Sequence, residues 1–153
     1  SDAEKAVAFY REYFALKGKF ENKLYGGTIP LLQKLKDGGR NLILATSKPE
    51  NFAAEIVNHF GLDRYLAHIA GATLTSERCE KPDVIRYALE KAGITEKDET
   101  VMVGDRKYDI LGAKANGIKS VGVLYGYGGE SELKEAGADF LAHTPADILE
   151  IIG

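Results

Sequence analysis

Hydroxyl groups and helix N–H groups come together just after an apolar run near the middle of the chain. Thr46 and Ser47 follow the run Asn41–Ala45, and a helix is predicted to begin a few residues later. Two hydroxyls beside the free backbone N–H groups of a helix start would suit a phosphate or another anion. Capping of that helix by Ser47 is the simpler explanation on local grounds, because caps of this kind are common.

A lysine stands where helix electrostatics do not favour one. Lys81 directly precedes Pro82, the expected first residue of a helix. A cation at a helix N-terminus opposes the helix dipole, so capping does not account for it. Pairing with Glu80, a solvated surface position and a role in binding an anionic substrate all remain open for Lys81.

Two carboxylates follow a third apolar run. Asp105 and Asp109 lie four residues apart after Thr100–Gly104, so they can converge at the end of a buried strand. Carboxylate oxygens suit Mg²⁺, which uses one or two of them together with water and substrate phosphate. Helix capping by the two aspartates, or their neutralisation by neighbouring basic residues, is the alternative. Gly104 favours the metal site, since glycine lets a ligand approach the backbone closely.

Other polar features have simpler explanations. His59, His68 and His143 share no ligand spacing, so a histidine metal site or catalytic triad is not expected. Cys79 has no nearby base and is interpreted as an ordinary thiol. The glycine-rich segment 125–129 is not a dinucleotide fingerprint, and we interpret it as a flexible loop at the rim that gates a site.

Alternating strands and helices must position these residues. Short apolar runs bounded by turn residues predict strands, and stretches with helical periodicity between them predict helices. The strands are expected at 41–46, 68–71, 100–104, 120–124 and 139–141. The helices are expected at 4–16, 28–37, 49–60, 82–92, 108–116, 131–136 and 145–151. This alternation predicts a doubly wound, Rossmann-like parallel α/β sheet, in which ligands bind beyond the carboxyl ends of the strands.

Composition narrows the class of protein. The 153 residues, 44% hydrophobic and 28% charged, are typical of one globular domain. A net charge of −3 argues against nucleic acid as a partner, because phosphate backbones require basic surfaces. No apolar stretch is long enough to cross a membrane, and no signal peptide is visible. Together with the single cysteine, these features make the cytoplasm the expected compartment.

The order of the motifs resembles the haloacid dehalogenase-like hydrolase superfamily. The matching pieces are an apolar strand ending in threonine, a Lys-Pro pair opening a helix, and an apolar strand followed by Gly-Asp-x-x-x-Asp, here Leu42–Thr46, Lys81-Pro82 and Val101–Asp109. Further segments resemble the phosphoglycolate phosphatase-like branch: Tyr25–Gly27, Thr46–Pro49, Asp105–Gly117, Val123–Gly128 and Ala136–Asp139.

The resemblance implies roles for these residues. Thr46, with Ser47 beside it, would bind the phosphoryl group, and Lys81 would bridge the phosphoryl oxygens and the nucleophile. Asp105 would bind Mg²⁺ directly. Asp109 would act on the metal indirectly, either through a metal-bound water or by contact with the groups that bind the metal. Residues 1–24 would be the end of a helical cap, and residues 25–153 the α/β core domain.

One departure from the family is serious. The family's nucleophile is the first aspartate of an Asp-x-Asp motif on the central strand, and this sequence contains no such motif. The strands ending at Thr46 and Gly104 would then face a gap. We therefore expect that a missing N-terminal segment, or another chain, completes the sheet, and that the chain alone is inactive.

The resulting hypothesis is a Mg²⁺-dependent phosphatase that acts through an aspartyl-phosphate. Its substrate would be a small phosphorylated metabolite such as a phosphoglycolate-like ester, a sugar phosphate or a nucleotide. A phosphomutase of the same superfamily and a non-catalytic regulatory relative are the alternatives. A haloacid dehalogenase proper fits less well, because it uses no metal. The sequence carries no signal for the oligomeric state.

Overall fold

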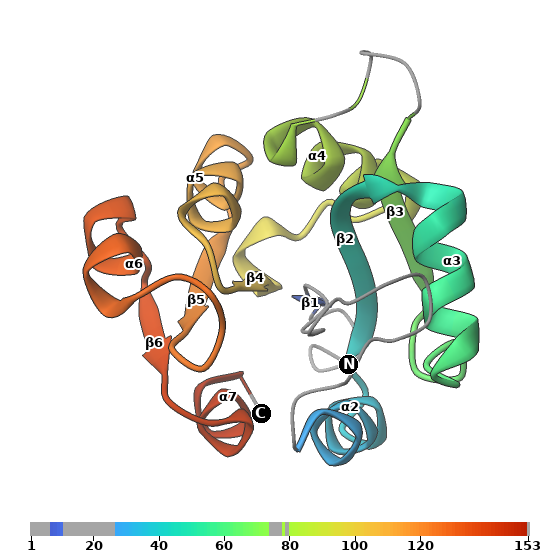
Figure 1. Ribbon diagram of the computed structural model, residues 1–153, viewed down its shortest axis with the longest axis horizontal. Coiled ribbons are helices and arrows are strands. Elements are labelled where there is room, and N and C mark those ends of the chain that lie inside the picture. Colours follow the sequence, from blue (N-terminus) through green and yellow to red (C-terminus); the bar gives the residue numbers. More distant parts are fainter. Residues whose placement is uncertain (1–6, 11–26, 74–77, 79, 153) are drawn as a thin grey trace.

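A parallel six-stranded sheet forms the centre of the molecule (Figure 1). The computed structural model describes residues 7–10, 27–73, 78 and 80–152. The strands lie in the order β3-β2-β1-β4-β5-β6, and every neighbouring pair is parallel. Their bounds are β1 Val7–Tyr10, β2 Asn41–Pro49, β3 His68–Ala72, β4 Thr100–Gly104, β5 Lys119–Val123 and β6 Phe140–Ala142.

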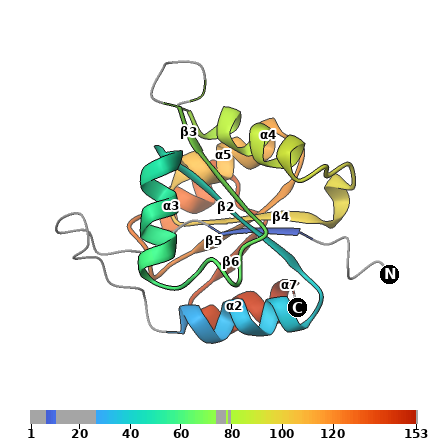
Figure 2. The same ribbon diagram turned by 90° about the vertical axis from the view of Figure 1, so that its right-hand side faces the viewer.

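Helices cover both faces of this sheet. They are α2 Thr28–Asp37, α3 Glu50–His59, α4 Lys81–Lys91, α5 Lys107–Ala115, α6 Glu130–Ala136 and α7 Pro145–Ile152, with a 3₁₀ turn at Lys97–Glu99. Buried residues of α2, α3 and α7 share one hydrophobic cluster, and those of α4 and α5 share another. Figure 2 shows α2 and α7 on the side of the sheet opposite α4 and α5. The α/β class and the doubly wound architecture are confirmed.

The two cores follow from the alternation of side chains along the strands. Leu42 and Leu44 of β2 belong to the cluster under α2, α3 and α7. Ile43 and Ala45, the residues between and after them, belong to the cluster under α4 and α5. Because successive side chains of a strand point to opposite faces, an unbroken apolar run fills both layers at once.

Most predicted elements exist within a few residues of their expected bounds, and glycines follow several of the helices. Gly93 and Gly117 follow α4 and α5 with φ of 66° and 71°, the left-handed conformation that glycine adopts without strain. The N-cap of α2 is Gly27, and Thr28 is the first residue of the helix.

The amino-terminal region differs from the prediction. A helix was expected over 4–16, but Val7–Tyr10 forms a strand, and the rest of that range lies outside the described residues. This strand pairs with both β2 and β4, so the position expected to be empty is occupied. A run of four apolar residues fits the spacing of a helix as well as that of a strand. A strand forms here because its backbone pairs with the N–H and C=O groups along the edges of β2 and β4, which would otherwise lack partners.

The packing between α4 and the sheet gives a stability prediction. Ile85 is fully buried, so Ile85→Ala should leave a cavity and lower the free energy of unfolding by about 2–5 kcal/mol. Arg86→Ala, on the exposed side of the same helix, should cost less than about 1 kcal/mol. Urea denaturation measures both changes, and similar losses for the two variants would contradict this packing.

Candidate functional site

The turn between β4 and α5 holds two buried carboxylates. Asp105 is 1% exposed and Asp109 is fully buried. Asp109 Oδ2 accepts the backbone N–H groups of Asp105 and Arg106, both at 3.1 Å. A Cβ at Gly104 would overlap the Asp109 side chain, so glycine is required at the strand end. One carboxylate therefore fixes the turn that presents the other.

Lys81 is buried against this turn. Its Nζ lies 3.0 Å from Asp109 Oδ1 and donates to the carbonyl oxygen of Ala45 at 3.2 Å. The lysine is only 4% exposed, so the interpretation as a solvated surface lysine is wrong. Lys81 thus links the end of β2, one residue before Thr46, to the β4–α5 turn. The structure brings these residues together from three separate parts of the sequence.

Close packing of α4 on α5 explains how the lysine is buried. A Cβ at Gly112 would lie 3.1 Å from Lys81 Cγ, so only glycine allows this approach without displacement. Asn116 at the end of α5 donates its Nδ2 to the carbonyl oxygen of Pro82 at 3.0 Å. The first turn of α4 is therefore tied to α5. No spacing in the sequence indicated this bond between Asn116 and Pro82.

Arg78, three residues before Lys81, makes several contacts with neighbouring elements. Arg78 donates its Nε to the Gly71 carbonyl at 2.8 Å, and its guanidinium lies 3.5 Å from the centre of the Tyr87 ring. Glu50 Oε1 lies 3.6 Å from the same guanidinium and accepts the Gly71 N–H at 3.1 Å. These contacts join the start of α3 and the Tyr87 side chain of α4 to the end of β3. No motif in the sequence signalled this network.

Thr46 and Ser47 lie in the second half of β2. Thr46 is 2% exposed, and its Oγ1 accepts the backbone N–H of Lys48 at 3.2 Å. Ser47 is exposed, and β2 continues past it to Pro49, which is the N-cap of α3. The prediction that Ser47 caps this helix is therefore wrong. Its hydroxyl lies instead at the wall of a pocket that also contains Lys81.

The glycine-rich loop packs directly on Asp105. Tyr127 donates its N–H to Asp105 Oδ2 at 3.0 Å, and Gly128 donates its N–H to the Asp105 carbonyl at 2.9 Å. A Cβ at Gly126 would overlap the Asp105 side chain. The loop was predicted to be a flexible gate at the rim. The structure shows that its backbone orients the carboxylate.

A glutamate of α6 supports the same turn. Glu132 Oε2 accepts Arg106 Nε at 2.9 Å and the Lys107 N–H at 3.0 Å. The Arg106 hydrogen bond, followed by that from Lys107, lowers the pKa of Glu132, and the pKa of Arg106 is raised by the same contact. An anion at the first turn of α5 also complements the helix dipole. No motif in the sequence includes Glu132, so the sequence did not indicate this contact.

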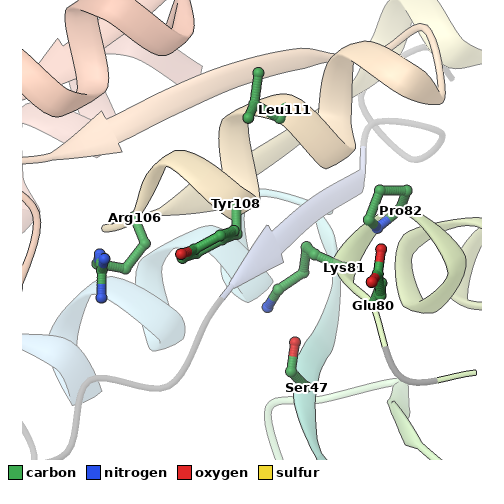
Figure 3. A pocket seen from close by; sticks show the side chains of 7 residues that line it. All are labelled: Ser47, Glu80, Lys81, Pro82, Arg106, Tyr108 and Leu111. Carbon is green, nitrogen blue, oxygen red and sulfur yellow. The ribbon is translucent and has the colours of Figure 1, made fainter.

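A pocket of about 520 Å³ opens beside Lys81. Ser47, Glu80 and Pro82 contribute to its walls, together with Arg106, Tyr108 and Leu111 from the β4–α5 region. Figure 3 shows the Lys81 amine between the Tyr108 ring and the Ser47 hydroxyl. Within the described residues, no group of three or more histidine, cysteine, aspartate or glutamate side chains forms a metal cage. No helix in the described part of the chain is long and apolar enough to span a membrane.

Most of the chain matches the sequence model of one protein family. The sequence model of the haloacid dehalogenase-like hydrolases matches residues 1–123. The chain belongs to this family. The resemblance proposed from the strand-end residues is therefore confirmed at the level of the family.

Individual relatives carry several names. The chain is 42% identical to a 5'-nucleotidase of Pseudomonas aeruginosa over 94% of its own length and 61% of that protein's. It is 30% identical to a phosphoglycolate phosphatase of Vibrio parahaemolyticus, covering 97% of this chain and 64% of that one. It is also 37% identical to the tyrosine-protein kinase PtkA of Mycobacterium tuberculosis, covering 99% and 52%. The chain thus spans roughly half to two thirds of these relatives.

A solved structure shares the fold. The crystal structure of a "predicted phosphatase" from Clostridium acetobutylicum superposes with a TM-score of 0.85 at 45% identity, covering 89% of this chain and 62% of that one. This haloacid dehalogenase-like chain therefore has the Rossmann-like core of its structural neighbours.

The buried ion pair gives a prediction with a matched control. Asp109→Asn removes the charge that faces Lys81, so the free energy of unfolding should fall by about 3–5 kcal/mol. Asp147 makes the same kind of cap at α7, where its Oδ2 accepts the His143 and Thr144 N–H groups at 2.9 and 3.2 Å. Asn can also cap, so Asp147→Asn should cost less than about 1 kcal/mol. Chemical denaturation at neutral pH compares the two, and equal losses would contradict a stabilising role for the ion pair.

The contact between Glu132 and Arg106 gives a pH prediction. The pKa of Glu132 is lowered by folding, so its contribution to stability is present above its usual pKa of about 4.3 and is lost as pH falls through the lower folded value. The difference in unfolding free energy between wild type and Glu132→Gln should therefore shrink towards acid pH. Thermal unfolding between neutral and acid pH measures this difference. A difference that stays constant across that range would be inconsistent with the ionised contact.

Proposed function

We propose that this chain forms most of the phosphoryl-binding site of a Mg²⁺-dependent phosphomonoester hydrolase. One observation carries the proposal: a buried lysine is ion-paired to Asp109 at the carboxyl ends of the strands, beside Thr46 and Asp105. A fold needs no buried cation at this place, since burying charges is costly even when they are paired. A site for a dianionic phosphoryl group does need one.

Each side chain has a distinct task in this proposal. Thr46 and Ser47 donate hydroxyl hydrogens to phosphoryl oxygens. Lys81 offsets the negative charge that spreads over these oxygens in the transition state, where electrostatic stabilisation does most of the catalysis. Asp109 orients the Lys81 ammonium and, through its two backbone hydrogen bonds, the turn that carries Asp105.

The carboxylates at this turn fit Mg²⁺. The ion takes oxygen ligands and keeps several waters, so one or two carboxylates with a substrate phosphate complete a typical site. Asp105 is the carboxylate suited to bind it, because Asp109 is engaged with Lys81 and with two backbone N–H groups. Asp109 would then act through a metal-bound water. When bound, the metal would neutralise phosphoryl charge.

The nucleophile is proposed to be an aspartate other than Asp105 and Asp109. The sequence contains no Asp-x-Asp motif, and Val7–Tyr10 in the central position carries no carboxylate. In the proposed reaction an aspartate carboxylate attacks phosphorus, the bond to the leaving oxygen breaks, and that oxygen takes up a proton. Water then attacks the same phosphorus, the bond between phosphorus and the carboxylate oxygen breaks, and phosphate leaves with the carboxylate restored. The proton that this water loses balances the one taken up by the leaving oxygen. The chain alone is accordingly proposed to be inactive.

The proposed substrate is a small phosphomonoester, consistent with relatives named 5'-nucleotidase and phosphoglycolate phosphatase. The relative named a tyrosine kinase performs another phosphoryl transfer, and a phosphomutase would use the same side chains. No observation in the site favours either of these reactions over hydrolysis. A purely regulatory role would not require the buried Lys81–Asp109 pair.

Turnover of the complete enzyme tests the two central residues. In a protein completed by an Asp-x-Asp segment, Lys81→Ala and Asp105→Asn should each lower kcat by about 100-fold or more, since each removes charge stabilisation of the transition state. Lys91→Ala, on the exposed part of α4, is the control and should retain wild-type kinetics. Phosphate release from an aryl phosphate, with Mg²⁺ and with chelator, provides the measurement. Unchanged kinetics in either site variant would remove that residue from the mechanism.

A further inference from the structure

Helix α5 exposes two large apolar side chains that its packing does not explain. Tyr108 is 52% exposed and Leu111 is 47% exposed. Residues three apart lie on the same side of a helix, so the two form one apolar strip. The side of α5 that packs into the core is made by Ile110 and Ala113, which are fully buried. Tyr108 and Leu111 are thus additional to the core.

This strip forms a wall of the pocket beside Lys81. Tyr108, Leu111 and Pro82 give the pocket apolar surface, whereas Lys81 and Ser47 supply polar groups. Tyr108 and Lys81 line the same pocket, as Figure 3 shows. A phosphoryl group held at Lys81 would therefore place its organic substituent next to an aromatic face. The volume of about 520 Å³ lies in the range of pockets that hold drug-sized ligands.

Cations flank the Tyr108 ring. The Arg106 guanidinium carbon and the Lys107 Nζ each lie 5.4 Å from the ring centre. Arg106 is itself held by Glu132 at 2.9 Å. Contacts with neighbouring side chains restrict the ring before any ligand binds. The ring therefore loses less conformational freedom when a ligand stacks on it.

We propose that Tyr108 and Leu111 form a subsite for the base of a nucleoside monophosphate, and that this subsite selects ring-bearing esters over small aliphatic ones. The inference rests on the proposed function, since it takes Lys81 as the place where the phosphoryl group binds. Stacking of a base on an aromatic side chain contributes about 1–3 kcal/mol and tolerates different bases, because every base has a flat face. A two-carbon ester would leave most of this pocket unfilled.

Calorimetric titration of the full chain, with Mg²⁺ present, tests the subsite without requiring turnover. Adenosine 5'-monophosphate and ribose 5-phosphate are the probes, because they share the phosphate and the sugar and differ only in the base. Wild type should bind the nucleotide about tenfold more tightly than the sugar phosphate, the factor that corresponds to about 1.4 kcal/mol of stacking. Tyr108→Leu should bring this ratio close to one, and Tyr108→Phe should keep it. Phe140→Leu removes an exposed aromatic ring of β6 that does not line the pocket, and should keep the ratio too.

The outcomes separate the subsite from the proposed function. If wild type binds both probes equally and Lys81→Met weakens both, the phosphoryl site stands and the base subsite is wrong. A preference for the nucleotide that survives Tyr108→Leu also overturns the subsite. If neither probe binds, or if Lys81→Met changes neither affinity, the proposed function fails and the subsite fails with it.

Discussion

The ion pair between Lys81 and Asp109 is the constraint on which the rest of the site depends. Both groups are almost completely buried, and their charged atoms lie 3.0 Å apart. Removing either charge would leave the other in a poorly solvated interior, which is far more costly than the pair itself. The ends of β2, β4 and α4 therefore have to meet in one arrangement. That arrangement places Asp105 and Thr46 at the same edge of the sheet.

Small residues make this arrangement sterically possible. Gly104 leaves room for the Asp109 side chain, Gly112 for the stem of Lys81, and Gly126 for Asp105. Around them, further hydrogen bonds fix the surrounding backbone, with Asn116 holding α4 to α5 and Glu132 holding the first turn of α5. The candidate catalytic side chains are thus positioned by neighbouring residues to which no catalytic role is assigned. Loss of these supports should misplace the site without removing any of its chemical groups.

The apolar runs and turn residues of the sequence predict most of the fold. They do so because the spacing of apolar residues within one strand or helix is visible over a short stretch of sequence. The strand-end motifs likewise identify Thr46, Lys81, Asp105 and Asp109 as candidates, and the family is confirmed, whereas their catalytic roles stay predictions. Local pattern fails at Val7–Tyr10, where apolar spacing suits a helix but the place between two strands requires a strand. It also cannot reveal Glu132 or the Arg78 network, since those contacts join residues far apart in the sequence.

Binding of inorganic phosphate tests most directly the claim that this strand-end site receives a phosphoryl group. Titration calorimetry in the presence of Mg²⁺ should show one site on the wild-type chain. Lys81→Met should weaken binding by about tenfold or more, because charge-assisted hydrogen bonds to phosphate are strong. Lys91→Met, which removes an exposed lysine from the same helix, should bind like wild type. Equal affinities for wild type and Lys81→Met, or no binding to either, would contradict the account.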